Sequence, residues 1–258
     1  MKNKIYKYDF LILGAGLIGS ITALALVKKK FKVLVIDNRN LTLKDNRTLA
    51  VNANSMDFLK QLGIWSKLKS QPQPIDKIVI KDKINTQPLI FENENETMGN
   101  VIFNKEIHKI SRQMLNNLKI FKTDSSIDIS DISPNKRINI DKKNYVFKKI
   151  VICIGKNIVS KIAHKSIIFD QGHQSYVGFF KHFRDHNNTA YEFFTDNGPL
   201  AILPAPKGNK KKSTFIYSTK EKINYYQIQK LINKNLEISH GQLVFDKSIS
   251  KFPVKPHL

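Results

Sequence analysis

The hydrophobic positions of the first 37 residues form strand-like and helix-like runs in turn. The apolar stretch at residues 10–13, which follows Asp9, is typical of a buried strand, and a Gly-x-Gly-x-x-Gly sequence at residues 14–19 follows it directly. Residues 20–27 are apolar over a helical length, and residues 31–37 form a second apolar run that ends in Asp37. This order of strand, glycine turn, helix, strand and terminal acid predicts a βαβ unit that binds a dinucleotide.

Helical and strand-like spacings both occur through the rest of the first half. Ser55 is expected to cap a helix that runs through Leu62, with Gly63 ending it. Residues 104–118 carry apolar side chains at helical spacing. The strands expected in this half are residues 75–81, 89–91, 120–122, 127–129, 138–140, 145–147 and 149–154.

The second half is dominated by alternating apolar and polar positions, with one helix expected at residues 224–236. Its expected strands are residues 175–183, 190–194, 200–204, 214–218, 243–245 and 252–254. The chain is therefore predicted to be α/β, a Rossmann-like FAD/NAD(P)-binding domain with an inserted, mainly antiparallel β-sheet domain for the substrate. The predicted boundaries are 1–71 and 99–165 for the cofactor domain, and 72–98 and 166–258 for the sheet domain.

Each glycine of the fingerprint has a separate expected role. Gly14 permits the tight turn, Gly16 lets the backbone approach a pyrophosphate, and Gly19 lets the helix pack closely on the sheet. The N–H groups at the start of the helix then face the phosphates. Asp37 is expected to accept hydrogen bonds from a ribose hydroxyl, with the simple end of a strand as the alternative.

The formal net charge of +22 raises the possibility of a nucleic-acid or anionic-membrane partner. Lysines supply nearly all of this charge and are spread along the chain, whereas only five residues are arginine, the type that phosphate recognition favours. No zinc-finger spacing or RNA-binding aromatic motif is present. The charge therefore does not establish a nucleic-acid partner, and none is predicted.

The single cysteine, Cys153, lies in an apolar run and cannot form an intrachain disulfide, which fits a reducing compartment. We interpret it as a small buried hydrophobic residue rather than a catalytic thiol. The uncharged run at residues 10–27 raises a membrane segment as an alternative, but its three glycines and the following strand favour the fingerprint. The protein is expected to be cytoplasmic.

The seven histidines give no clear metal-ligand pattern. Only His182 and His186 lie at a suggestive spacing, and they fall across a predicted strand end rather than on a helix face. They are therefore predicted to be ordinary surface histidines, and no metal site is expected.

Five sequence blocks resemble those of one family. They are residues 9–27, 47–51, 62–65, 98–102 and 190–204, and the last block is the most specific. The family is the FAD-dependent aromatic hydroxylases of ubiquinone biosynthesis, within the para-hydroxybenzoate hydroxylase-like flavoprotein monooxygenases. The resemblance runs over nearly the whole chain.

This resemblance implies hydroxylation of the ring of a polyprenyl phenol, with FAD as cofactor, NADH or NADPH as external reductant and O₂ as cosubstrate. The flavin would carry the chemistry, so no catalytic side chain is predicted. A peripheral approach to the inner face of the membrane and a ubiquinone-biosynthesis protein complex are further implied partners. The implied cofactor-binding residues are Gly14, Ala15, Gly16, Leu17, Ile18, Gly19, Asp37, Arg47 and Arg112, and the implied substrate residues are Tyr191 and Phe193.

Two departures from the family pattern leave alternatives open. Ile154 stands where the family carries the Asp of an Ala-Asp-Gly-like motif, within residues 153–158. The chain also ends before the family's Gly-Asp motif, and so resembles an N-terminal portion of the family. The alternatives are a non-catalytic remnant or assembly subunit of the same pathway, or another FAD- or NAD-dependent oxidoreductase.

Overall fold

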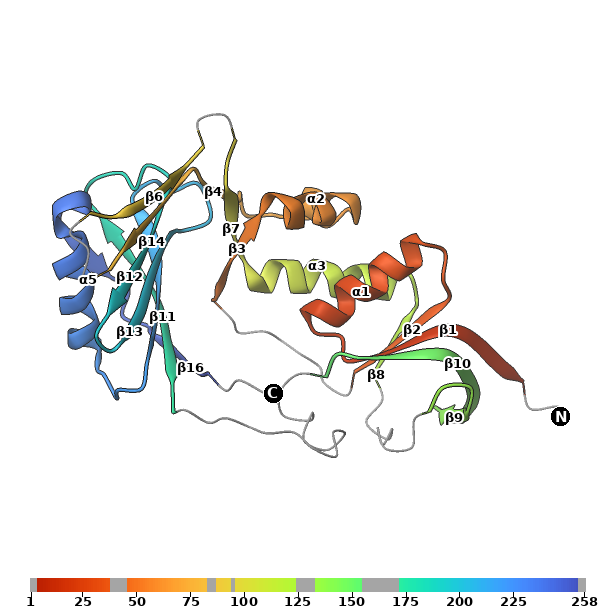
Figure 1. Cartoon of the computed structure of the whole chain (residues 1–258). Helices are drawn as coiled ribbons and strands as arrows, with labels where there is room; N and C mark the ends of the chain where they lie inside the picture. The colour runs from red at the N-terminus through yellow and green to blue at the C-terminus, as the bar shows by residue number, and fades with distance from the viewer. Residues whose placement is uncertain are drawn as a thin grey trace. The chain divides into compact units, whose positions relative to one another are not determined.

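The computed structural model describes residues 4–37, 46–82, 87–93, 96–123, 133–154 and 172–254. The chain divides into two compact units (Figure 1). The first unit comprises Met1–Lys44, Lys60–Lys67 and Lys105–Ile167. The second unit comprises Asp45–Leu59, Leu68–Asn104 and Ile168–Leu258. The predicted domain boundaries differ from these in residues 45–59, 68–71, 99–104 and 166–167, and the functional division into domains stays a prediction.

The first unit contains a sheet in the order β8-β2-β1-β10-β9. Strands β8, β2, β1 and β10 are parallel, and β9 is antiparallel to β10. The bounds of these strands are β1 Ile5–Leu13, β2 Val33–Asp37, β8 Phe121–Thr123, β9 Arg137–Ile140 and β10 Lys143–Ile152. Helix α1, Leu17–Lys28, connects β1 to β2, so the predicted βαβ unit is present. Helix α3, Asn104–Asn117, precedes β8.

The continuous apolar sequence of β2 follows from its central place in this sheet. Every residue of β2 is buried, as expected for a parallel strand covered on both faces. The core around it joins residues that are far apart in the sequence. Its buried members are Leu11, Leu13, Leu34, Ile36, Ile138, Ile140, Tyr145, Phe147 and Ile154.

The prediction of separate strands at residues 145–147 and 149–154 is wrong, because residues 145–147 and 149–152 belong to one strand, β10. Its parallel pairing with β1 runs from Ile5↔Asn144 to Leu13↔Ile152. The charged residue Lys148 does not interrupt the strand, since its ammonium lies 2.8 Å from a carboxylate oxygen of Asp9 on the neighbouring strand. The strand predicted at residues 127–129 lies outside the described residues.

The second unit contains an extended sheet in the order β15-β11-β14-β13-β12-β5-β6, with β16 also pairing with β11. The pairs are antiparallel except for β12 with β5. The strands are β5 Lys77–Lys81, β6 Leu89–Glu92, β11 Gln174–His182, β12 Thr189–Thr195, β13 Gly198–Pro204, β14 Lys212–Thr219, β15 Leu243–Phe245 and β16 Ser250–Pro253. The prediction of a mainly antiparallel sheet is therefore confirmed for this unit.

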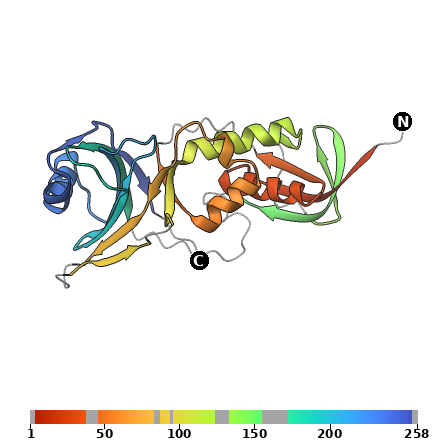
Figure 2. The same ribbon diagram turned by 90° about the horizontal axis from the view of Figure 1, so that it is seen from above.

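Helix α5, Tyr225–His240, covers one face of this sheet (Figures 1 and 2). Its Ile228, Ile232 and Leu236 are buried and repeat at four-residue intervals, so they form one apolar stripe. The sheet contributes the rest of this core, from alternate positions of β11 to β14. These residues are Tyr176, Phe180, Phe193, Leu200, Ile202, Phe215 and Tyr217.

A small antiparallel sheet in the order β3-β7-β4 also belongs to the second unit. Its strands are β3 Thr48–Asn52, β4 Gln73–Ile75 and β7 Gly99–Phe103. Helix α2, Ala53–Gln61, follows β3, and a 3₁₀ turn, η1, covers Trp65–Lys67. The predicted cap residue of α2 is wrong. The side-chain oxygen of Asn52 accepts a hydrogen bond from the backbone N–H of Ser55 at 2.9 Å, so Asn52 caps the helix.

Within the described ranges, no helix is both long enough and apolar enough to cross a membrane.

Candidate cofactor site

The turn after β1 requires glycine at two of the three predicted positions. Gly14 has φ +96°, and a Cβ placed on it would lie 2.3 Å from the carbonyl oxygen of Cys153. A Cβ on Gly19 would lie 2.0 Å from the carbonyl oxygen of Gly14. Both positions therefore hold α1 tightly against the carboxyl ends of β1 and β10, as the close-packing role of a fingerprint glycine demands.

Gly16 is different, because a Cβ there would meet no atom within 4 Å. Gly16 is the N-terminal cap of α1, and no side chain caps this helix end. The first backbone N–H groups of a helix have no intrahelical partner, and they carry the positive end of the helix dipole. The open space at Gly16 and these N–H groups fit the approach of a phosphate group. Ala15, Leu17 and Ile18 complete the turn, and Ile18 is 68% exposed.

Asp37, at the end of β2, is buried beside this turn. Its Oδ2 accepts a hydrogen bond of 2.7 Å from the backbone N–H of Ala15. The hydroxyl of Ser20 in turn donates to the carbonyl oxygen of Ala15 at 3.1 Å. The Asp37 carboxylate therefore holds the N–H of Ala15, and the Ser20 hydroxyl holds its carbonyl oxygen. Asp37 thus positions the glycine turn. Its predicted contact with a ribose stays a prediction.

Arg112 of α3 lies beside the carboxylate of Asp37. Its Nη2 is 3.9 Å from Oδ2 of Asp37, and both side chains are largely buried. The guanidinium also lies over the ring of Phe121 in β8, with its central carbon 3.9 Å from the ring centroid. A guanidinium held in this way is well oriented to contact an anionic or hydroxyl-bearing ligand. The structure thus brings together Arg112, Asp37 and the glycine turn.

Arg47 lies in the second unit, directly before β3. Its guanidinium carbon is 4.6 Å from the ring centroid of Phe252 in β16. The backbone carbonyl of Arg47 accepts a hydrogen bond of 3.0 Å from the N–H of Asn104. The predicted contact of Arg47 with FAD stays a prediction.

Tyr191 and Phe193, the predicted substrate residues, lie on the face of β12 that α5 covers. Their rings stack at 5.8 Å with an angle of 1° between the planes. Phe193 is 3% exposed and belongs to the core beneath α5, and Tyr191 packs against that core. The structure therefore places both in the core of the second unit, and their role in binding a substrate stays a prediction.

Glu192 points to the opposite face of β12, because neighbouring side chains of a strand alternate. It is half-buried, and burial raises the pKa of its carboxyl group. This is the one acidic residue of the described strands β11 to β14, and a raised pKa is typical of carboxyl groups at functional sites. Glu192 could not be predicted as a site residue from the sequence, since an acid in an alternating strand usually faces solvent.

The prediction that His182 and His186 lie on the surface is wrong. Both are buried, together with His240 at the end of α5. The His182 ring lies 5.9 Å from that of His186 and 4.7 Å from that of His240, centroid to centroid. The Nδ1 of His182 is 2.6 Å from the carbonyl oxygen of Arg184, and its Nε2 is 3.0 Å from the Ser213 hydroxyl. Both ring nitrogens of His182 are therefore already engaged.

Burial lowers the pKa of all three histidines, to about 4 for His186 and His240. The neighbouring His182 ring lowers the pKa of the other two further. The cluster is therefore uncharged at neutral pH. No group of side chains suited to hold a metal ion occurs in the part of the chain that the structure describes.

Cys153 and Ile154 follow β10 beside the glycine turn. The thiol of Cys153 is half-buried, and burial raises its pKa, which makes it a poor nucleophile. Ile154 is 8% exposed and belongs to the core of the first unit. The rest of the block at residues 153–158 lies outside the described residues.

Comparison with known proteins bears directly on this site. Residues 7–131 match the model of a family described as "FAD binding domain". The chain is 27% identical over 229 residues to the ubiquinone biosynthesis monooxygenase COQ6 of Caenorhabditis elegans, covering 79% of this chain and 51% of that protein. It is 25% identical over 218 residues to the ubiquinone hydroxylase UbiL of Rhodospirillum rubrum, covering 78% and 50%. The chain spans about half the length of these relatives.

Solved structures with similar folds include p-nitrophenol 4-monooxygenase PnpA from Pseudomonas putida, with a TM-score of 0.67 and 11% identity over 98% of this chain and 69% of that one. The flavin-dependent brominase Bmp2 gives a TM-score of 0.66 and 13% identity over 97% and 68%. At these identities the likeness concerns the fold, and it confirms the predicted fold class. The predicted resemblance to the ubiquinone hydroxylases and the predicted cofactor, FAD, are confirmed by the family and relative matches.

Proposed function

We propose that this chain, with its FAD-binding domain and its resemblance to the ubiquinone hydroxylases, is an FAD-dependent monooxygenase of ubiquinone biosynthesis. The proposed substrate is the aromatic ring of a polyprenyl phenol, with NADH or NADPH as reductant and O₂ as cosubstrate. The observation that carries the proposal is the match of the FAD-binding-domain model to residues 7–131, which include the glycine turn, Asp37 and Arg112. The relatives named above support the choice of substrate class.

The residues present fit an FAD site in the first unit. The space at Gly16 and the uncapped start of α1 would receive the pyrophosphate. Asp37 and Arg112 would lie toward the adenosine side, where Asp37 keeps the backbone of Ala15 in place. When bound, the flavin supplies the transfer of one oxygen atom to an electron-rich ring. The chain's own task is to bind and orient this cofactor.

The second unit is the proposed substrate side. Its sheet carries Glu192 on the face opposite α5, where burial raises the pKa of the carboxyl group and so makes the carboxylate a stronger base than that of an exposed glutamate. The phenol hydroxyl of the proposed substrate is the group from which such a proton would come. A polyprenyl phenol resides in a membrane, so a peripheral membrane approach and a ubiquinone-biosynthesis protein complex are part of the proposal.

The test begins with the absorbance spectrum of the purified protein, before and after reconstitution with FAD. Flavin bands that remain after gel filtration are expected. NADH or NADPH is then added in air with a polyprenyl phenol, and the hydroxylated ring is measured by mass spectrometry. Failure of the purified chain to bind FAD on reconstitution would contradict the proposal.

The main alternative is a non-catalytic assembly subunit of the same pathway. The specific observation on its side is that Ile154, which stands where the family carries an Asp, is buried in the core of the first unit. This alternative predicts a stable flavin spectrum without oxidation of NADH or NADPH. It also predicts that hydroxylation appears only when another polypeptide is added.

A further inference from the structure

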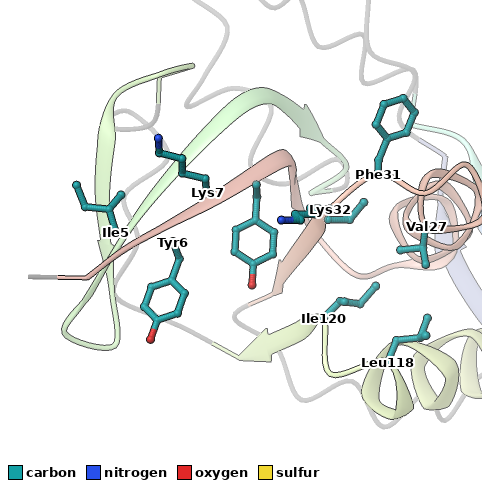
Figure 3. A pocket seen from close by; sticks show the side chains of 10 residues that line it. Ile5, Tyr6, Lys7, Val27, Phe31, Lys32, Leu118 and Ile120 are labelled. Atoms are coloured by element: carbon teal, nitrogen blue, oxygen red, sulfur yellow. The ribbon is translucent and has the colours of Figure 1, made fainter.

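A pocket of about 640 Å³ opens in the first unit at the end of the sheet opposite the cofactor turn (Figure 3). It is lined by the start of β1 (Ile5 to Tyr8), by residues 31–33 at the start of β2, by Val27 of α1, and by Leu118 and Ile120 between α3 and β8. A strand rises about 3.3 Å per residue, so Tyr6 and Gly14 lie roughly 25 Å apart along β1. This pocket is therefore separate from the place where FAD is expected.

The rim of the pocket is apolar and accessible. Ile5 is 38% exposed, Phe31 44% and Leu118 45%. Three large apolar side chains that surround one opening form a patch of the kind that marks an interaction site. The aromatic members are held in place, since Phe31 packs edge-on against Phe10 at 5.2 Å and Tyr6 stacks on Tyr145 at 5.3 Å.

The charged residues at the pocket are all cationic. Lys7 and Lys32 line it, and the ammonium groups of Lys4 and Lys143 lie 5.3 Å and 5.9 Å from the centroid of the Tyr6 ring. Among the residues that the structure describes, no acidic side chain lines the pocket. Its neighbour Asp9 is already neutralised, because one carboxylate oxygen lies 2.8 Å from the ammonium of Lys148. The other oxygen accepts the backbone N–H of Lys32 at 2.9 Å.

Building on the peripheral membrane approach in the proposed function, we propose that this pocket is a contact site for the surface of an anionic phospholipid bilayer. The exposed apolar rim enters the boundary between headgroups and acyl chains, and the lysines contact the lipid phosphates. Long lysine side chains suit this task, because their stems lie along apolar surface while their ammonium groups reach the headgroups. A dissolved anion would satisfy the lysines but leave Ile5, Phe31 and Leu118 in water, so the bilayer is the occupant that fits both features.

The first experiment measures co-sedimentation of the full chain with vesicles. One set contains phosphatidylcholine alone, and the other contains phosphatidylcholine with phosphatidylglycerol. We expect at least ~10-fold tighter binding to the anionic vesicles, and loss of most of that difference in the double variant Lys7→Glu/Lys32→Glu. The matched control is Lys220→Glu/Lys222→Glu, which makes the same change in net charge on exposed residues of the second unit.

The control decides between a defined contact and diffuse attraction to a chain of net charge +22. Equal losses in the two double variants overturn the proposal, and so does equal binding of the parent protein to both kinds of vesicle. Circular dichroism establishes that each variant is folded, and Lys7→Gln/Lys32→Gln replaces the charge reversal if that variant does not fold. The measurement involves neither FAD nor turnover, so its failure is distinct from failure of the proposed hydroxylation.

The second experiment tests the apolar rim. A Phe31→Trp variant places an indole at the opening, and vesicles whose acyl chains carry bromine quench only fluorophores that reach them. The parent protein, which has a single tryptophan at position 65, supplies the background. Quenching above that background is expected with anionic brominated vesicles. Quenching no greater than that of the parent protein shows that the rim stays outside the bilayer and overturns the proposal.

Discussion

Asp37 Oδ2 and the backbone N–H of Ala15 form a hydrogen bond of 2.7 Å between the end of β2 and the turn that follows β1. This bond joins two segments that are 22 residues apart, and it does so inside the protein. A hydrogen bond from a backbone N–H to a buried carboxylate is charge-assisted and strong, so the turn is fixed before any ligand arrives. The conformation of the proposed phosphate-binding turn is therefore a property of the folded chain.

Two replacements of the Asp37 carboxylate should separate its proposed role in FAD binding from its role in holding the turn. Asp37→Asn keeps an oxygen that can accept the Ala15 N–H but removes the charge, and we expect FAD to bind ~10-fold more weakly with little loss of stability. Asp37→Ala also removes the acceptor, and should lower the free energy of unfolding by about 1–3 kcal/mol. Flavin fluorescence titration and urea unfolding measure the two effects.

The control for this prediction is Asp141→Asn. Asp141 is exposed, follows β9 and pairs with Lys122 at 2.7 Å, and neither of these two residues belongs to the glycine turn. Unchanged FAD affinity is expected there. Equal weakening in Asp37→Asn and Asp141→Asn would contradict a specific role for Asp37.

The glycine turn gives a second, internally controlled pair of variants. Gly14→Ala forces a Cβ to within 2.3 Å of a backbone oxygen at a positive φ, so we expect a loss of at least ~3 kcal/mol in unfolding free energy. In Gly16→Ala the added Cβ would meet no atom within 4 Å, and the backbone at this position is extended. This variant should fold normally and bind FAD less tightly. Normal FAD binding by Gly16→Ala would place the phosphate elsewhere.

The histidine cluster makes stability depend on pH. The pKa of His186 and His240 is lowered from 6.5 to about 4 in the folded protein, so the unfolded chain binds more protons between these values. Stability should then be lost as pH falls from about 6.5 through about 4, by a few kcal/mol in all. The charged groups that face the cluster oppose one another, since Asp185 raises the pKa of His182 and of His186, whereas Lys211 lowers that of His182 and Lys210 that of His186.

Urea unfolding at a series of pH values, followed by circular dichroism, measures this dependence. His186→Gln removes one titrating ring and should flatten the slope between pH 6.5 and 4. An unchanged slope in this variant would assign the acid sensitivity to other groups.

The core beneath α5 allows a matched test of packing. Ile232 is fully buried, and its replacement by alanine should lower the free energy of unfolding by about 2–5 kcal/mol. Ile238, on the same helix, is 90% exposed, and its replacement by alanine should change stability by no more than about 0.5 kcal/mol. Comparable losses in the two variants would mean that α5 packs through a different face.

The sequence predicted best those elements whose signals are local. The run from β1 through the glycine turn to β2 could be predicted, because strand composition, glycine spacing and the terminal acid all lie within about 30 residues. The helix stripe of α5 could be predicted for the same reason. Arg112 was predicted only through a family resemblance, since its place beside Asp37 depends on how α3 packs.

The buried histidines could not be predicted from local pattern. His182 ends a strand, His186 lies in the following turn, and His240 ends a helix 54 residues further on. Each lies in a segment of mixed polarity that is typical of a surface. Only the pairing of β11 with β14 and the packing of α5 bring the three rings together, and these long-range contacts leave no trace in residue spacing.

The parallel pairing of β5 with β12 sets the order in which the chain can fold during synthesis. Ile78 pairs with Ala190, more than a hundred residues later, whereas the sheet of the first unit is complete once residue 152 has emerged. In that interval β5 and β6 can form only a hairpin, and β6 exposes Leu89, Ile90 and Phe91 even in the finished sheet. An unpaired apolar ribbon invites association with other chains. The nascent polypeptide is therefore expected to need chaperone protection between the emergence of β6 and that of β12.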